Sequence, residues 1–291
     1  MATVSKVPAK TPDTDIKRPS ATSQVRRAPV RTSQTRRRLE NLIWQILLIG
    51  SLLALWEFAS DRWVPALFIG KPSQIGATIW KWTIDGTFAD NLWVTIKATL
   101  MGFGSGASLG MLFGYCTGTW RRLGEILQPI VTAFYTLPRL ALAPLFLLWF
   151  GLGIEFRVVF SATIVFFLVY YNTYFGVREV SGELIAAVRI MGANRLQLAT
   201  RVVVPSALVW VMAGLKISVP YALVGVVVAE MLASTEGLGY LLSKSATQFN
   251  ASGTFAAIAG LLLIALVIDW VLTLLTSHAL RWKTAGHTGQ Q

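Results

Sequence analysis

Long apolar runs constrain this chain more than any other feature of its sequence. Six of them follow one another, each close to the ~20 residues that a helix needs to cross a bilayer. In lipid, every backbone N–H and C=O group must pair within the segment, and a helix is the only open-ended structure that achieves this. We therefore expect an all-α integral membrane protein with six transmembrane helices. The runs cover residues 42–59, 93–116, 127–150, 156–177, 206–229 and 255–277.

The composition also indicates a lipid environment, because only 14% of the residues are charged and 54% are hydrophobic. Soluble domains carry about a quarter charged residues. A net charge of +12 would suggest nucleic acid in a soluble domain, but ten of the 26 Lys and Arg precede Leu39. We interpret residues 1–40 as a disordered, basic cytoplasmic tail that is either solvated or bound to anionic lipid, and we expect no nucleic-acid partner.

The segments between the apolar runs predict the orientation of the chain. Cytoplasmic loops carry an excess of Lys and Arg, which places both the N-terminus and the C-terminus inside. Residues 41–283 then form the membrane domain, and residues 284–291 form a C-terminal tail. Outside the N-terminal tail, the basic residues of the inner loops are Arg121, Arg122, Arg178, Arg189, Arg195, Arg201, Arg281 and Lys283.

Several kinds of chemistry find no support in the sequence. The chain has one cysteine, Cys116, and two histidines, His278 and His287, which lie near its C-terminal end. A disulfide framework within the chain is thus excluded, and we expect no metal site. Each Lys that precedes Ser or Thr lacks the glycine of a phosphate-binding loop. We expect no catalytic residue and no cofactor on this chain, so any ATP that drives it binds to another subunit.

The segment between the fourth and fifth runs has a different character. Residues 183–191 form an amphipathic helical pattern that Gly192 interrupts, and a second helix is expected over 195–203, ending before Pro205. Two short helices therefore meet at a glycine on the cytoplasmic surface. Small side chains at positions 186–187 leave a flat patch to which the backbone of a partner can approach.

This segment resembles the signature loop of binding-protein-dependent ABC importer permeases. That pattern reads Glu-Ala-Ala, three residues, Gly, nine residues, an aliphatic residue, any residue, Leu and Pro. When the segment is aligned on Gly192, residues 186–188 stand for the triplet and Pro205 matches the final proline, but Ala186 replaces the acid and Val204 replaces Leu. The resemblance implies that this loop, residues 183–205, contacts an ATPase. The residues assigned to that contact are Glu183, Ala186, Ala187, Arg189, Gly192, Ala193, Arg195 and Pro205.

Further stretches, within 137–153, 172–178 and 229–240, are similar to one subfamily of these permeases, and the whole resemblance covers roughly residues 42–283. That subfamily imports aliphatic sulfonates, taurine, nitrate, bicarbonate and some heterocyclic precursors. Membership implies a bacterial cytoplasmic membrane protein that pairs with a second permease copy, usually identical. It also implies an ATPase dimer that binds ATP and Mg, and an external solute-binding protein. We expect a small anion as the solute, with a sulfonate or taurine first.

Polar residues within the apolar runs are candidates for a translocation path. Arg139 and Lys216 either attract an anionic solute or extend toward the membrane interface. Glu230 is either a gate or an interfacial charge, and the tyrosines and asparagine of the fourth run either line the path or bond neighbouring helices. Pro144 and Pro220 are expected to kink their helices. The candidate path residues are Arg139, Tyr171, Asn172, Tyr174, Lys216 and Glu230.

Two other classes of function remain as alternatives. An ion-coupled carrier or channel needs no ATPase, but such carriers have ionisable residues within their spans. The only acids clear of the expected span ends are Glu57 and Asp269. A membrane enzyme would need a histidine–carboxylate or metal-binding group, for which the sequence offers no candidate. Copurification of an ATPase distinguishes the importer permease from both alternatives.

Overall fold

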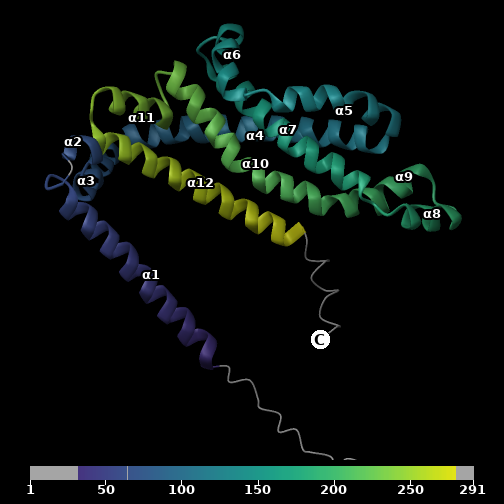
Figure 1. The fold of residues 1–291 in the computed structure, drawn as a ribbon, viewed down its shortest axis with the longest axis horizontal. Coiled ribbons are helices and arrows are strands. Elements are labelled where there is room, and N and C mark those ends of the chain that lie inside the picture. Colours follow the sequence, from purple (N-terminus) through teal and green to yellow (C-terminus); the bar gives the residue numbers. More distant parts are fainter. Residues whose placement is uncertain (1–31, 64, 280–291) are drawn as a thin grey trace, which may run out of the picture. The chain divides into compact units, whose positions relative to one another are not determined.

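The computed structural model describes residues 32–63 and 65–279, and the regular elements of this part of the chain are all helical (Figure 1). They fall into two compact units that divide after Ser51. Helix α1 (Thr32–Ala59) crosses this division. Disorder was predicted for residues 1–40, but residues 32–40 belong to α1, where Arg, Leu and Glu favour helix. Residues 1–31 and the predicted tail 284–291 lie outside the described residues.

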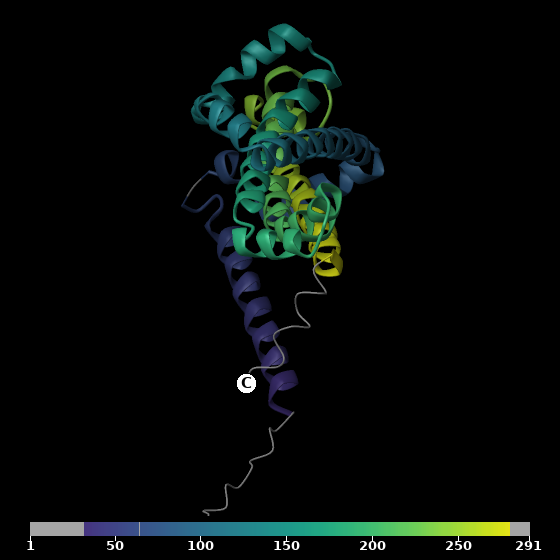
Figure 2. The same ribbon diagram turned by 90° about the vertical axis from the view of Figure 1, so that its right-hand side faces the viewer.

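In the second unit, α4, α7, α10 and α12 lie side by side, with α8 and α9 at one end and α11 at the other (Figure 1). Figure 2 looks onto the end that carries α8 and α9. The bounds are α2 (Ala66–Ile69), α3 (Pro72–Ile84), α4 (Thr87–Thr119), α5 (Arg121–Thr136), α6 (Ala143–Phe150), α7 (Ile154–Arg178), α8 (Gly182–Ile190), α9 (Arg195–Leu198), α10 (Val204–Ala233), α11 (Leu238–Thr247) and α12 (Ala251–Ala279), with a 3-10 turn η1 (Arg139–Leu142) and a π turn η2 (Ala199–Val203).

Four helices of the described residues are long and apolar enough to cross a membrane, and a bent pair adds a fifth. Helix α4 has 33 residues but falls short in hydropathy because it contains many glycine, serine and threonine residues. The chain is therefore an all-helical protein with several membrane-spanning helices. The helices that qualify are Leu39–Ala59, Ile154–Arg178, Arg195–Ala233 and Ala251–Ser277, and the bent pair is Arg121–Thr136 with Arg139–Phe150.

The third apolar run is broken, so the prediction of one continuous helix over 127–150 is wrong. Helix α5 ends at Thr136, and Leu137 is extended, with ψ 137°. The cause is Pro138, because proline disfavours helical geometry in the residue before it. The two halves meet at 78°. The expected kink at Pro144 is also absent, since this proline lies in the first turn of α6, where a missing N–H costs little.

Helices α4 and α7 approach each other so closely that glycine is required at the contact. A Cβ atom added at Gly110 would lie 2.7 Å from the carbonyl oxygen of Phe166, and a Cβ at Gly102 would lie equally close to Ser161. The sequence of this run, with glycine at positions 102, 104, 106 and 110, predicts close helix packing through small residues, and these contacts confirm it. Gly104 differs, because an added Cβ there meets no atom within 4 Å.

We predict that Gly110→Val destabilises the protein, because the new side chain meets backbone atoms of α7 that cannot move without separating the helices. Overpacking of this kind costs about 1–3 kcal/mol or more, and roughly 2 kcal/mol corresponds to about 5 °C in a protein of this size. The measurement is the melting temperature of the detergent-solubilised protein. The matched control is Gly104→Val on the same helix, which should melt close to the native protein; equal losses in both variants would contradict the assignment.

Candidate functional site

The loop of residues 183–205 folds as two helices that meet at a glycine. Helix α8 begins after Ser181, whose Oγ accepts the amide of Leu184 at 3.4 Å, and it ends two residues before Gly192. Gly192 has φ +84°, a conformation that favours glycine. A Cβ atom added there meets no atom within 4 Å, so the backbone angle and not the space selects this residue. The predicted break at Gly192 is confirmed.

The second helix of the loop does not end before Pro205, as the sequence had predicted, but continues into α10. It starts with a capping box, in which Asn194 Oδ1 accepts the Gln197 amide at 2.8 Å and Gln197 Oε1 accepts the Asn194 amide at 3.0 Å. The π turn follows directly and leads into Val204. Because Pro205 has no N–H and its ring crowds the carbonyl four residues earlier, the wider turn accommodates it without ending the helix.

Large apolar side chains project from this loop into solvent. Ile190 is 87% exposed, Met191 84% and Leu196 71%. Ala186 and Ala187 are exposed as well, and α8 has no buried residue. Beside Gly192 and Met191 lies a hollow of about 470 Å³. Contiguous apolar surface of this kind marks a site of contact with another molecule.

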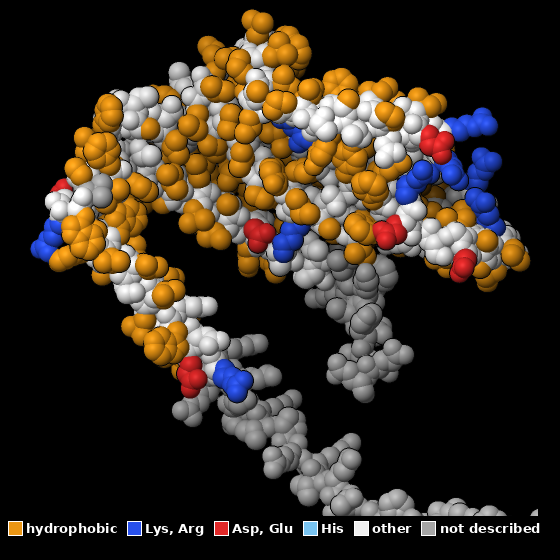
Figure 3. All heavy atoms as spheres, viewed as in Figure 1, with side chains coloured by type: hydrophobic (Ala, Val, Ile, Leu, Met, Phe, Trp, Pro, Cys, Tyr) orange, Lys and Arg blue, Asp and Glu red, His pale blue; other side chains and the backbone are white. Residues whose placement is uncertain are grey.

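Positive charge surrounds this apolar surface. In Figure 3 several Lys and Arg side chains gather, with some Asp and Glu side chains among them, at the end of the second unit where Figure 1 places α8 and α9, while hydrophobic side chains cover most of the face. Glu183, the nearest acid to the expected motif position, lies exposed in the first turn of α8. The exposed arginines on α5, α7 and the loop are Arg121, Arg122, Arg178, Arg189, Arg195 and Arg201.

A second feature lies at the break between α5 and η1, where Arg139 lines a hollow of about 460 Å³. Its guanidinium lies over the rings of Tyr135, at 4.7 Å, and Phe167, at 4.8 Å. No carboxylate among the described residues forms an ion pair with it, and its Nε has no hydrogen-bond partner there. Its Nη2 donates to the Tyr135 carbonyl at 3.2 Å. A half-buried arginine whose Nε is free is suited to binding an anion.

The three polar residues predicted on the fourth run lie in different surroundings. Tyr171 bonds Thr132 of α5 through the two hydroxyls at 2.8 Å, and its ring contacts that of Tyr135 at 4.9 Å. The structure thus brings Tyr171 next to Arg139 through the Tyr135 ring. Tyr174 donates to Gln128 of α5 at 3.3 Å. The Asn172 amide bonds within its own helix, to the carbonyl of Leu168.

The two remaining candidate path residues, Lys216 and Glu230, differ in burial. Lys216 is exposed on α10. Glu230 is 1% exposed, so the interpretation of it as an interfacial charge is wrong. It accepts hydrogen bonds from the Thr95 hydroxyl, at 2.9 Å, and from the Gly239 amide, at 2.8 Å. Arg157, which the sequence analysis did not select, lies beside it and is 5% exposed. Its position at the start of the fourth apolar run was a signal, because charges within membrane spans are costly and seldom incidental.

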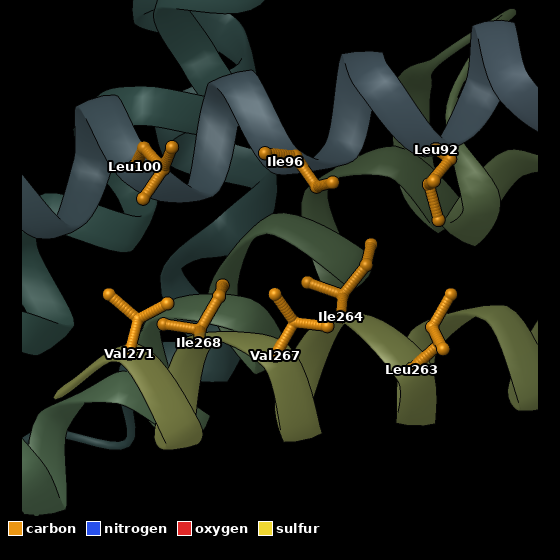
Figure 4. Close-up of a pocket in the computed structure, with 8 residues that line it drawn as sticks. All are labelled: Leu92, Ile96, Leu100, Leu263, Ile264, Val267, Ile268 and Val271. Atoms are coloured by element: carbon orange, nitrogen blue, oxygen red, sulfur yellow. The ribbon is translucent and has the colours of Figure 1, made fainter. Parts of the chain in front are cut away.

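Another hollow, of about 300 Å³, lies between α4 and α12 (Figure 4). Its walls carry only aliphatic side chains, which offer no group to orient a polar solute. Among the described residues, no group of three His, Cys, Asp or Glu lies close enough to hold a metal ion. The residues that line this hollow are Leu92, Ile96, Leu100, Leu263, Ile264, Val267, Ile268 and Val271.

Comparison with known proteins adds a family and several relatives. The family described as "binding-protein-dependent transport system inner membrane component" matches residues 106–280. The chain is 32% identical over 244 residues to the putative aliphatic sulfonates transport permease protein SsuC of Bacillus subtilis, covering 82% of this chain and 87% of that protein. It is 32% identical over 235 residues to the formylaminopyrimidine transport permease protein ThiX of Halalkalibacterium halodurans, covering 80% and 92%. With the taurine transport system permease protein TauC of Escherichia coli it shares 31% over 248 residues, covering 81% and 89%.

A solved structure of the MetNI methionine ABC transporter, in an inward-facing conformation, has a similar fold. The TM-score is 0.60 at 17% identity, and the match covers 68% of this chain and 98% of that chain. At this identity the likeness concerns the fold alone. The family match spans more than half of the 291 residues, and the relatives match over most of their length. The chain belongs to the family of binding-protein-dependent transport system inner membrane components and is a multi-pass permease of a bacterial ABC importer.

Proposed function

We propose that this permease moves a small anion across the bacterial cytoplasmic membrane and is driven by a separate ABC ATPase that grips the 183–205 loop. A solute-binding protein delivers the anion from outside, and a second copy of the chain completes the path. ATP and Mg bind to the ATPase, and this chain has no catalytic role. The observation that carries the proposal is the loop itself, because its exposed apolar side chains lie on two helices that continue into the bundle.

The loop is suited to transmitting movement because it is joined to long helices on both sides, closely to α7 and without a break to α10. A three-residue connection, 179–181, joins α7 to α8, and η2 joins α9 to α10 without a break. A subunit that holds Ile190, Met191 and Leu196 therefore pulls directly on α10. The surrounding arginines favour a partner with an acidic rim, since electrostatic complementarity guides association.

The anion is proposed from the surroundings of Arg139. A positive charge in a hollow lined by two tyrosines and by aliphatic side chains binds a compact anion through charge-assisted hydrogen bonds. We rank the candidate solutes by the names of the relatives. Sulfonates and taurine come first, after SsuC and TauC, followed by nitrate or bicarbonate and by heterocyclic precursors of the kind that the name of ThiX describes.

We further propose six spans, with both ends of the chain inside. Helix α4 is roughly 50 Å long at 1.5 Å per residue, which exceeds the thickness of the hydrocarbon core. Its glycine face packs against α7, so low hydropathy on that face does not bring it into conflict with lipid. The bent pair supplies one more span. The exposed arginines around α8 and α9 support a cytoplasmic position for that end.

An ion-coupled carrier is the weaker alternative. One of the two acids that such a mechanism would use, Glu57, accepts hydrogen bonds from the Ser73 hydroxyl, at 2.7 Å, and from the Ser73 amide, at 3.0 Å. This carboxylate therefore holds the first turn of α3. Asp269 remains, exposed on α12 and without an ion pair among the described residues. A single acid does not make a proton relay.

We predict that Gly192→Trp abolishes coupling to the ATPase. The substitution forces a bulky residue into a backbone conformation at φ +84° that non-glycine residues rarely adopt, and it places an indole on the contact surface. The complex with the ATPase is reconstituted in nanodiscs, and ATP hydrolysis is measured with and without the binding protein. We expect stimulation to fall at least about tenfold, which is about 1.4 kcal/mol.

The control for this prediction is Gly76→Trp in α3, an exposed glycine whose added Cβ also meets nothing within 4 Å. It introduces the same bulk away from the loop and should be stimulated like the native protein. A chain that transports without any ATPase would refute the importer mechanism and favour the ion-coupled carrier.

We predict that Arg139→Gln lowers anion uptake, because it removes the charge from the hollow. Hydrogen bonds to charged groups contribute about 1.5–3 kcal/mol, so uptake should fall by about tenfold or more. Uptake of radiolabelled taurine, an alkanesulfonate, nitrate and bicarbonate is measured in proteoliposomes that contain the complete transporter. Arg139→Lys keeps the charge and should retain part of the uptake.

The matched control is Arg62→Gln, because Arg62 also lies over an aromatic ring, that of Phe58 at 3.9 Å, but lies on the surface. If Arg139 only extends to the membrane interface, both variants will take up anions at the native rate, and the proposed path through this hollow will be wrong.

A further inference from the structure

A buried ionic cluster joins three helices at the end of the bundle opposite α8 and α9. Arg157 lies in the first turn of α7, and Glu230 lies in the last turn of α10. Their side chains are 6% and 0% exposed. The Arg157 Nη1 atom lies 3.8 Å from Glu230 Oε1, and Nη2 donates to Glu236 Oε1 at 2.9 Å. Glu236 belongs to the connection between α10 and α11, and its side chain is 55% exposed.

The same cluster holds the start of α11. The first amides of a helix have no partner within the helix, and here the amides of residues 237–239 are each bound by a side chain. Asn91 Oδ1 accepts the first at 2.6 Å, Thr95 Oγ1 accepts the second at 2.9 Å, and Glu230 Oε2 accepts the third at 2.8 Å. Because Asn91 and Thr95 belong to α4, the cluster ties α11 to α4 and α10 at once.

Stability alone is a poor explanation for this arrangement. Replacing a buried ion pair by apolar groups is often neutral or stabilising. The pair is also incompletely bonded, because Arg157 Nε and Nη1 find no hydrogen-bond partner in the described part of the chain. One arginine is thus shared between two carboxylates, one fixed inside the bundle on α10 and one on the exposed connection to α11.

The position of the cluster indicates what it does. Helices α7 and α10 carry the 183–205 loop at one end and are joined by Arg157 and Glu230 at the other, roughly 37 Å away along the 25 residues of α7. Packed helices slide past each other by small amounts. An ion pair at the far end opposes sliding there, so a displacement imposed at the loop reaches the far ends of both helices together.

We propose that Arg157 and Glu230 are positioning residues for transport, which clamp the far ends of α7 and α10 to the start of α11 so that these elements move as one body. This inference rests on the proposed coupling of the loop to an ATPase. The clamp carries the movement of the loop to the connection between α10 and α11, on the side where the binding protein delivers its solute.

The test uses the complete complex of full-length chain, ATPase and binding protein in nanodiscs. ATP hydrolysis is measured with and without binding protein saturated with a mixture of taurine, an alkanesulfonate, nitrate and bicarbonate. The variant Arg157→Met/Glu230→Gln removes both charges, yet the new glutamine still accepts the Gly239 amide. We expect stimulation by the binding protein to fall at least tenfold while basal hydrolysis stays within twofold of native. The second variant is Arg157→Gln, which leaves Glu230 and its hydrogen bonds to Thr95 and Gly239 in place. It has the same expected result.

Two controls separate this role from a merely structural one. Arg157→Lys keeps the charge and should restore at least half of the native stimulation. Glu155→Gln removes an exposed charge from the same turn of α7 and should behave as native. Hydrogen exchange of the amides of residues 237–239 reports the local fold, and in the double variant we expect their protection to remain.

The outcomes distinguish the clamp from the proposed function. Native stimulation in both Arg157→Met/Glu230→Gln and Arg157→Gln would overturn the clamp and leave the importer mechanism intact. Loss of stimulation that occurs only together with loss of amide protection would also overturn it, because the cluster would then be structural. A native complex that neither binds the ATPase nor responds to the binding protein would refute the proposed function, and the clamp with it.

Discussion

The approach of α4 to α7 through a face of glycines fixes the arrangement of the second unit. Backbone meets backbone along this contact, and a single added methyl group at Gly110 or Gly114 would reach a carbonyl oxygen of α7. Helix α7, held in this way, also contacts α10, where the Ser161 hydroxyl donates to the carbonyl of Ala222 at 2.9 Å. Both features of functional interest depend on this arrangement, because α7 and α10 carry the exposed loop at one end and the buried cluster at the other.

The sequence predicted those features that depend on local physics. Apolar runs of helical length, a glycine between two amphipathic helices and small residues at a helix contact each follow from properties of consecutive residues, and the structure contains all three. The family was also accessible, because the spacing from Gly192 to Pro205 is a local pattern. The roles assigned to the loop residues and to the path residues remain predictions.

What the sequence did not predict depends on partners that are distant along the chain. Pro205 was expected to end a helix, but the π turn before it provides room for the ring. Glu230 was predicted to be either a gate or an interfacial charge, and its burial was not predicted because its partners, Thr95 and Arg157, come from other helices, separated from it by 135 and 73 residues in the numbering. Run length and hydropathy also could not reveal that the chain bends by 78° beside Pro138, since most of the residues from 127 to 150 are apolar on both sides of the bend.

The π turn at Ala199–Val203 affects how α10 is rotated about its own axis. A π turn contains one residue more than the α-helical turn that it replaces, and one residue corresponds to about 100° around a helix axis. All side chains after Val203 are therefore rotated by about 100° from the direction that an unbroken α-helix starting at Arg195 would give them. Closing this turn to α geometry without removing a residue would rotate Gly214 and Ser218 away from their present direction, whereas deletion of one residue from it would leave their direction unchanged. The π geometry of this turn, as much as the composition of α10, determines which face of α10 meets α7.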